Sequence, residues 1–446
     1  MPRSTSIAAA LAATFALAPV QAAEPPPADL AAMQQRLDQL ERMVGQLQTQ
    51  LDAERQARQK IESAAVIRPV TDGKSLKFQS PGNDFAFQVG GRVEADFAHY
   101  DADRQDLGDG TDIRRGRLYA QGTLYRDWDW KFEYEFADNA TTSTNSKGIT
   151  DAYLRYKGFA PALITAGNFK QPFGLEQMMS AHNLTFTERA LSQAFVPGRG
   201  IGVGVQTSGA HWSLAGAMAG ERPEGEVAAE GDEGWNLTAR GTYAPFIDPG
   251  RVLHFGASVW RHEPNDSSSA LRWRSKPESN VTGVFLVDTG TLTAVDDVLA
   301  GGLELAGVWG PLSLQGEYMS ADVNRGAARD ARFDGGYVQA SWFLTGESRP
   351  YKVAEGIFDR VTPNASVGLG GIGAWELAAR LSTIDLTDAG IVGGRQDDVT
   401  LALNWYLAPN LRLMLDYVQV LELDRPGNLA DGDEPASLTG RVHVDF

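Results

Sequence analysis

The sequence predicts an all-β protein: a transmembrane β-barrel of about 16 antiparallel strands, preceded by a short N-terminal coiled-coil helix. Three observations support this class. The 446-residue chain ends in a row of alternating residues closed by Phe446, many segments with the same alternation precede it, and the connections between them alternate between short and long. A strand that meets lipid on one side and water on the other has this alternation, and bacterial barrels have short turns at one end and long loops at the other.

Residues 1–22 form a predicted secretory signal peptide. Arg3 precedes an apolar run over residues 7–20, and small residues follow at Ala22 and Ala23. This pattern indicates export and cleavage after Ala22. The run is too short for a membrane helix, which needs about 20 apolar residues. The chain contains no cysteine, so we expect neither disulfides nor cysteine-ligated metals.

A heptad pattern over residues 28–62 predicts a coiled coil. Its apolar residues recur with alternating spacings of three and four: Leu30, Met33, Leu37, Leu40, Val44, Leu47 and Leu51. A lone helix of this length is marginal in water, so we expect an oligomerisation helix, trimeric and periplasmic. A helix that packs on its own barrel is the alternative. Residues 63–84 are expected to be a linker.

From Phe85 to Phe446 the chain is a series of alternating segments, which we assign to the barrel. The expected strands cover residues 85–97, 112–125, 128–138, 149–157, 162–170, 199–207, 210–219, 234–243, 252–262, 299–309, 312–323, 335–345, 373–384, 397–407, 410–421 and 437–446. About sixteen strands is an even number within the size range of barrels whose closed ring leaves an aqueous channel.

The connection lengths give an independent test of the barrel. Short connections at 126–127, 158–161, 310–311 and 408–409 alternate with long ones near residues 101–110, 138–148, 171–198, 220–234, 263–298, 324–334, 387–397 and 422–436. This parity places both barrel ends in the periplasm. It also argues against a soluble β-sandwich, which is the alternative for the terminal strand. The exception is 346–371, a nominally periplasmic connection that is too long for a turn.

Charge and motif content narrow the function. The formal net charge of -17 argues against a nucleic-acid partner, because phosphate contacts need a basic surface. The six histidines lack metal-ligand spacing, and the sequence has no Gly-x-Ser-x-Gly nucleophile motif. We therefore expect no metal, no cofactor and no enzymatic activity.

Several sequence blocks carry a family resemblance. They are 112–119 (DIRRGRLY), 167–176 (GNFKQPFGLE), 184–189 (LTFTER), 196–199 (VPGR), 272–278 (RWRSKPE) and 344–351 (LTGESRPY). Through them the chain resembles the phosphate- and polyphosphate-selective porin O and P family of bacterial outer membranes, over essentially the whole barrel. The resemblance implies a trimer of sixteen-stranded anion-conducting barrels, with the third and fifth outer loops folded inward as a constriction.

An anion filter needs fixed positive charge in a narrow passage, and the planar fork of Arg matches phosphate oxygens. Arg272, Arg274 and Lys276 are spaced by two, so an extended segment places all three on one side. The resemblance implies that their loop lines the pore. A solvated basic patch on an outer loop is the alternative.

Further candidates lie on the second strand. Arg115 and Arg117 share its predicted lumen face, and Arg114 lies at its lip. These three either form pore wall or balance Glu133 and Glu135 on the next strand.

The third loop and a later strand supply the remaining candidates. Lys170 matches the family block Gly-x-Phe-Lys-x-Pro-Phe, and Arg199 follows in the same loop. For Arg189, our interpretation is an ion pair with the adjacent Glu188 that holds the loop in the barrel. Arg380, on the lumen face of its strand, is a candidate for a positive track.

We therefore expect an outer-membrane porin with a water-filled, anion-preferring channel for phosphate, pyrophosphate or polyphosphate. Its expected partners are small inorganic anions, outer-membrane lipid and lipopolysaccharide, and further copies of the chain in a homotrimer. The alternative is a general diffusion porin whose coiled coil tethers the outer membrane to the cell wall. Acidic residues near Asp103, Glu233 and Asp433 would repel an entering anion if they lie in the vestibule.

Overall fold

The computed structural model describes residues 27–64, 68–71, 76–137, 147–220, 233–265 and 269–446. The chain divides into two compact units, residues 1–66 and 67–446. The predicted signal peptide lies outside the described residues. None of the helices among the described residues is long and apolar enough to cross a membrane.

The first unit contains one long helix, α1 (Pro27–Ala64). The helix that the heptad pattern predicts is therefore confirmed. Its apolar row lies open along a single chain: Met33, Leu37 and Leu47 expose 69%, 58% and 59% of their side chains. The pairing of this helix with other copies stays a prediction.

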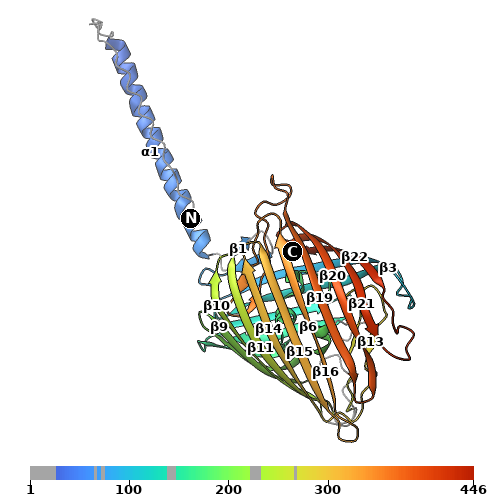
Figure 1. Ribbon diagram of the computed structural model, residues 1–446. Helices are drawn as coiled ribbons and strands as arrows, with labels where there is room; N and C mark the ends of the chain where they lie inside the picture. The colour runs from blue at the N-terminus through green and yellow to red at the C-terminus, as the bar shows by residue number, and fades with distance from the viewer. Residues whose placement is uncertain (1–26, 65–67, 72–75, 138–146, 221–232, 266–268) are drawn as a thin grey trace. The chain divides into compact units, whose positions relative to one another are not determined.

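The second unit is a closed antiparallel barrel of sixteen strands within the described part of the chain (Figure 1). The strands are β3 (Ala86–Asp101), β4 (Gly110–Leu124), β5 (Trp128–Glu135), β6 (Gly148–Tyr156), β7 (Ala162–Lys170), β8 (Arg199–Ser208), β9 (Trp212–Gly220), β10 (Trp235–Asp248), β11 (Arg251–Glu263), β14 (Asp297–Trp309), β15 (Leu312–Asn324), β16 (Ala331–Phe343), β19 (Ala374–Asp388), β20 (Ile391–Ala408), β21 (Leu411–Asp424) and β22 (Ala436–Asp445). Each pairs with the next, and β22 pairs with β3 to close the ring, from Ala436 opposite Asp101 to Asp445 opposite Arg92. The predicted fold class is confirmed.

The C-terminal Phe446 is held where the ring closes. Its backbone N–H and carbonyl exchange hydrogen bonds of 3.0 and 2.9 Å with Gly91. Gly91 allows this close approach, because a Cβ at that position would lie 2.6 Å from the Phe446 ring. The alternating tail thus completes the barrel at the end where β3 begins.

Part of the segment expected to be a linker belongs to the barrel sheet. β1 (Arg68–Thr71) and β2 (Leu76–Gln79) form an antiparallel pair, and β2 also pairs with β3, with Leu76 opposite Val89. β2 therefore continues along the edge of β3 where β22 has ended. Short strands in this segment escaped the sequence analysis because only a few residues of each alternate.

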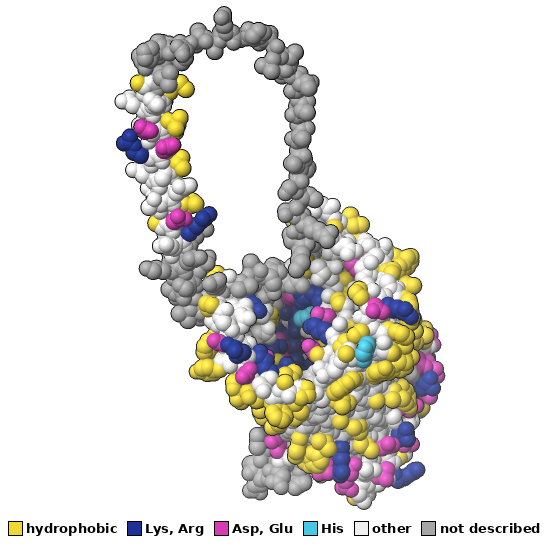
Figure 2. Space-filling view, turned by 90° about the vertical axis from the view of Figure 1, so that its left-hand side faces the viewer, with side chains coloured by type: hydrophobic (Ala, Val, Ile, Leu, Met, Phe, Trp, Pro, Cys, Tyr) yellow, Lys and Arg dark blue, Asp and Glu magenta, His cyan; other side chains and the backbone are white. Residues whose placement is uncertain are grey.

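The alternation in the strands separates a lipid-type surface from a polar interior. On β14, Leu299, Leu303 and Leu305 expose 46%, 63% and 51% of their side chains, whereas Glu304 between them is buried inside the barrel. Figure 2 shows hydrophobic side chains spread over the outer wall, beside a hollow in which charged side chains gather. A closed barrel satisfies its backbone hydrogen bonds internally, so such a wall can face hydrocarbon.

Three connections fill the interior. Loop 171–198 carries α2 (Leu175–Met178), η1 (Ala181–Asn183) and η2 (Leu191–Phe195); loop 269–296 carries β12 (Arg274–Ser275) and β13 (Val287–Asp288); segment 344–373 carries β17 (Tyr351–Lys352) and β18 (Ile357–Phe358). The loops belong to one end of the barrel, which we call the loop end. Segment 344–373 belongs to the other, the turn end, where β3 begins and β22 ends. Apolar side chains from the loops, including Phe173, Phe195 and Trp273, pack with the inner wall into one buried cluster.

The long connection that breaks the short-and-long parity is therefore an inward fold. Its residues contact loop 171–198, where Asn183 Nδ2 donates to Asp359 Oδ1 at 3.3 Å. It also contacts the barrel wall, where Arg240 donates to the carbonyl oxygens of Glu355 and Gly356 at 3.0 and 2.8 Å. Segment 344–373 and loop 171–198 thus enter the barrel from opposite ends and meet inside it.

Candidate functional site

A cavity of about 530 Å³ lies where the three in-folded connections face the wall. Of the charged side chains that line it, thirteen are Lys or Arg and six are Asp or Glu. The thirteen are Arg92, Arg114, Arg115, Arg117, Lys131, Arg155, Lys170, Arg189, Arg199, Arg272, Arg274, Lys276 and Lys352. Since the whole chain has a formal net charge of -17, this positive lining is a property of the site and not of the composition.

Arg272, Arg274 and Lys276 come together at the loop-end side of the cavity. The β12–β13 pair positions them, with Arg274 opposite Asp288. The Arg274 guanidinium lies 3.9 Å from the Phe285 ring centroid, and the Lys276 ammonium lies 5.5 Å from the same ring. All three line the cavity, so the predicted row of positive charges exists in space.

The three members of this row differ in how their charge is compensated. Arg272 Nε donates to Asp288 Oδ1 at 2.8 Å, whereas Lys276 Nζ donates to the neutral carbonyl of Asn280 at 3.0 Å. Burial of the Lys276 amine lowers its pKa to about 8. Among the described residues, no carboxylate lies within salt-bridge distance of Arg274. Arg274 is thus the member of this group whose charge no described carboxylate pairs within salt-bridge distance.

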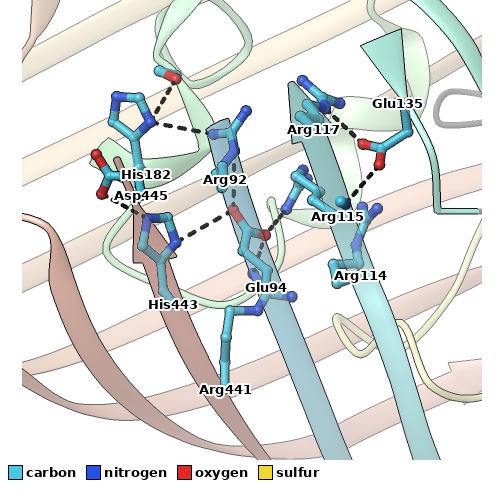
Figure 3. Close-up of polar contacts among 12 residues, drawn as sticks. Arg92, Glu94, Arg114, Arg115, Arg117, Glu135, His182, Arg441, His443 and Asp445 are labelled. Carbon is cyan, nitrogen blue, oxygen red and sulfur yellow. Dashed lines mark hydrogen bonds and ion pairs between the residues drawn. The ribbon is translucent and has the colours of Figure 1, made fainter. Parts of the chain in front are cut away.

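Arg115 and Arg117 of β4 face the cavity but are neutralised by acidic neighbours (Figure 3). Arg115 Nη1 forms an ion pair with Glu94, and Arg117 donates to Glu135 at 2.6 Å and to Glu133 at 3.1 Å. The sequence left two interpretations open: these arginines form the pore wall, or they balance nearby carboxylates. The structure combines the two. These arginines line the cavity, yet their charge is shared with carboxylates.

Glu188 anchors loop 171–198 to the wall. Arg114 donates to both of its carboxylate oxygens, at 2.6 and 2.9 Å, and Arg441 donates to it at 2.8 Å. Burial alone would raise the pKa of the Glu188 carboxyl, but the ion pair with Arg114 outweighs it and holds that pKa well below its usual range. Glu188 is thus a fixed negative charge that ties the loop to β4 and β22.

The expected pairing of Arg189 with Glu188 is wrong. Arg189 donates instead to the carbonyl oxygens of Glu176 and Met179, both at 3.1 Å. Glu188 reaches the wall, whereas Arg189 turns back across its own loop. Arg189 consequently brings a cation to the cavity that no described carboxylate neutralises through a salt bridge.

Lys170 and Arg199 lie opposite each other at the ends of β7 and β8. Lys170 Nζ donates to the carbonyl oxygens of Gln177 and Met179, at 2.6 and 3.1 Å. Arg199 instead donates to Asp151 at 2.8 Å, and Asp151 also accepts from Lys131 at 2.6 Å. Lys170 is therefore held by neutral carbonyl groups, whereas Arg199 is part of an ion-pair network.

Arg380 is not at the cavity wall, although it lies on the inner face of β19. Its side chain is fully buried beneath the loops, 4.3 Å from the Phe186 ring centroid. Nε donates to Glu278 of loop 269–296 at 3.1 Å, and Nη1 lies 3.4 Å from Glu176 of loop 171–198. The assignment of Arg380 to a positive track is corrected: it joins the two loops to the wall.

Arg92 on β3 was not among the residues predicted from the sequence to line the pore. Arg92 lines the cavity, and its Nη1 lies 3.2 Å from Nδ1 of His182 in loop 171–198 (Figure 3). Glu94 is 3.7 Å away and is shared with Arg115. The signal that could have revealed Arg92 is its place on the inner face, one strand from the Arg115 and Arg117 pair.

The far side of the cavity is formed by segment 344–373. Lys352, Glu355 and Asp359 line it there, and Lys352 lies 3.1 Å from Asp359. The long connection near residues 346–371 had no assigned place in the sequence analysis, because inward folding of a connection leaves no local pattern. Among the described residues, no group of three or more His, Asp or Glu is placed to hold a metal ion.

Comparison with known proteins agrees with this architecture. Residues 87–446 match the family described as phosphate-selective porin O and P. An uncharacterized protein of Caulobacter vibrioides is 30% identical, covering 100% of this chain and 97% of its own length. Porin O of Pseudomonas aeruginosa is 28% identical, covering 84% of this chain and 93% of its own. Among solved structures, the anion-selective porin from Comamonas acidovorans has the same fold, with a TM-score of 0.50 and 12% identity over 81% of this chain and all of that one.

Proposed function

Because this chain belongs to the porin O and P family of outer-membrane channels, we propose that it forms an anion-preferring pore whose filter is the cavity described above. One observation supports this proposal above all: thirteen basic but only six acidic side chains line the cavity, although the protein as a whole is acidic. Fixed positive charge in a confined, poorly screened passage attracts anions and repels cations.

The lining cations divide into two kinds with different roles. Arg114, Arg115, Arg117 and Arg199 are held in ion pairs, so they stiffen the wall and position the in-folded loops. Arg274 and Lys276 lie beside the Phe285 ring. Arg189 and Lys170 donate to carbonyl oxygens, and Arg92 shares Glu94 with Arg115. These five are the cations that an anion meets on its way through.

This arrangement suits transfer rather than tight binding. The available cations come from loop 269–296, from loop 171–198, and from β3 and β7, so an anion can exchange one partner for the next across the cavity. Conduction requires sites that attract an ion but release it again. Guanidinium groups donate in pairs to phosphate oxygens, which favours phosphate, pyrophosphate or polyphosphate, as the family description and porin O suggest.

The same proposal covers assembly and orientation. We place the turn end and α1 in the periplasm, the wall in outer-membrane lipid with lipopolysaccharide at the loop end, and three copies in the complete channel. The open apolar row of α1 supports pairing with other copies. A Leu40→Cys variant tests the pairing, because the chain contains no other cysteine. Oxidation should link chains covalently, and a variant that stays monomeric under oxidising conditions would contradict the coiled coil.

The anion preference can be tested in planar bilayers with the purified full-length protein. Reversal potentials in a chloride gradient should show preference for the anion, and millimolar phosphate or pyrophosphate should block the chloride current. Arg274→Gln should weaken the block several-fold. Arg329→Gln, in the exposed loop between β15 and β16, should leave it unchanged. A pore that prefers cations or resists both blockers would support the alternative, a general diffusion pore.

A further inference from the structure

Residues 365–373, which we call the tip hairpin, form a tight turn at the end of segment 344–373. The N–H of Gly373 donates to the Ala365 carbonyl at 3.0 Å, and the N–H of Val367 donates to the carbonyl of Leu407 at the end of β20, at 2.8 Å. The tip hairpin is therefore fastened both to itself and to the barrel.

A tryptophan pair places the tip hairpin beside the outer wall. On β20, Asn404 donates to the Thr185 carbonyl of loop 171–198 inside the barrel, so the next residue, Trp405, faces outward. Trp405 Nε1 donates to the Ile372 carbonyl at 2.8 Å. The Trp405 ring stacks on Trp375 of β19, with centroids 4.9 Å apart. Ile372 therefore lies next to two outward-facing aromatic rings, away from the lumen.

The large side chains of the tip hairpin are apolar and exposed. Leu369 is 86% exposed and Ile372 is 68% exposed, so most of each residue's surface is open. Residues 361–373 contain no charged side chain. The next outward residue on β19, Leu377, is 42% exposed and lies opposite Leu403, so the apolar surface continues directly into the lipid-type wall.

Glycines fix the shape of this projection. Gly368, Gly370 and Gly373 have φ of +84°, +86° and +74°, which other residues rarely adopt. A Cβ at Gly371 would lie 2.1 Å from the Ala365 carbonyl oxygen. The turn is thus compact, and it presents Leu369 as a fixed apolar tip.

We propose that the tip hairpin is a membrane-docking element that inserts Leu369 and Ile372 into the lipid leaflet at the turn end. Trp375 and Trp405 mark the level of the headgroups, where tryptophan rings of membrane proteins gather. The occupant is lipid because the exposed residues extend the lipid-facing wall without a break and carry no charge for a polar partner. Insertion removes apolar surface from water, which is favourable.

The chain without cysteine allows a direct test. Leu369→Cys in the full-length protein is labelled with an NBD fluorophore and reconstituted into phosphatidylcholine vesicles. Two matched variants serve as references. Leu303→Cys, on the outer wall of β14, is the reference for lipid, and Ala328→Cys, in the exposed loop 325–330 beside Arg329 and Asp330, is the reference for water. Chloride conductance of each labelled variant confirms that the barrel has formed, independently of its ion preference.

If the tip lies in lipid, NBD at position 369 should emit at a shorter wavelength than NBD at position 328. Doxyl groups placed high on the lipid acyl chains should quench its fluorescence, and aqueous Co²⁺ should not, as at position 303. Quenching by Co²⁺ equal to that at position 328 would mean that the tip lies in water. Protection from both quenchers would mean that protein covers the tip. Either result overturns the proposal.

Discussion

Arg380 gives a sharp test of how the lumen is built, because its position on the inner face suggests a filter residue while its contacts make it a loop anchor. We consider Arg380→Gln. The substitution leaves the carboxylates of Glu278 and Glu176 without the guanidinium that lies within 3.1 and 3.4 Å of them. Arg380 and Glu176 expose 0% and 2% of their side chains, so water does not replace the lost partner.

The magnitude follows from this burial. Removing one partner of a buried ion pair costs about 3–5 kcal/mol. At about 1.4 kcal/mol per tenfold change, the ratio of docked to undocked loops should fall by roughly two to four powers of ten. The control is Arg395→Gln. Its pair with Asp397, at 2.9 Å, has an arginine that is 49% exposed, and such surface pairs contribute about 0–1 kcal/mol.

Single-channel recording distinguishes the two roles. If Arg380 anchors the loops, Arg380→Gln should increase both the open conductance and the current noise, and should lower the anion-to-cation permeability ratio, while Arg395→Gln resembles the parent protein. The sixteen-strand ring should still form, which gel mobility before and after heating can check. A quiet channel with reduced conductance would refute the anchoring role and restore Arg380 to the filter.

Three further predictions concern the cavity. Glu188→Gln removes the carboxylate that ties loop 171–198 to Arg114 and Arg441, so the current noise in single-channel recordings should increase, as for Arg380→Gln; a channel as quiet as the parent protein would contradict the anchoring role. Lys276, with a pKa of about 8, is positive below that pH and neutral above it, so the anion-to-cation permeability ratio should fall as pH rises from 6.5 to 9.5. Lys276→Arg should abolish this fall, and an unchanged slope would place the titrating group elsewhere. Arg92→Gln should lower the chloride conductance several-fold, since it removes a lining cation beside His182; an undiminished conductance would show that anions bypass β3.

The strands could be predicted from the sequence because their signal is local. A residue such as Leu303 meets the outer surface and Glu304 meets the interior whatever the loops do, so the period of two survives in every strand. The last strand, which ends in Phe446, could be predicted for the same reason. The short strands β1 and β2 were missed because four residues each give too little alternation to stand out.

The site was predictable only in part, because a side chain that points into the barrel can still be covered by the in-folded loops and so not line the cavity. Arg274, Lys276 and Lys170 line the cavity as expected, whereas Arg380 shares their inward orientation but lies under loops 171–198 and 269–296. Which inward cations stay open depends on contacts between residues far apart in sequence, such as Arg380 with Glu278. No spacing rule reports such contacts.

The acidic character of the chain is compatible with an anion path because its charges are sorted by position. Asp433, one of the acids expected to repel an anion, is buried and accepts hydrogen bonds from the N–H groups of Arg104 and Gln105 at 3.0 and 2.9 Å. It therefore holds loops together and does not line the cavity. Acids that do line it, such as Glu188 and Asp151, sit in ion pairs that orient cations. Net charge thus describes how the whole protein interacts at long range, whereas ion preference depends on the few charges that remain unbalanced inside the cavity.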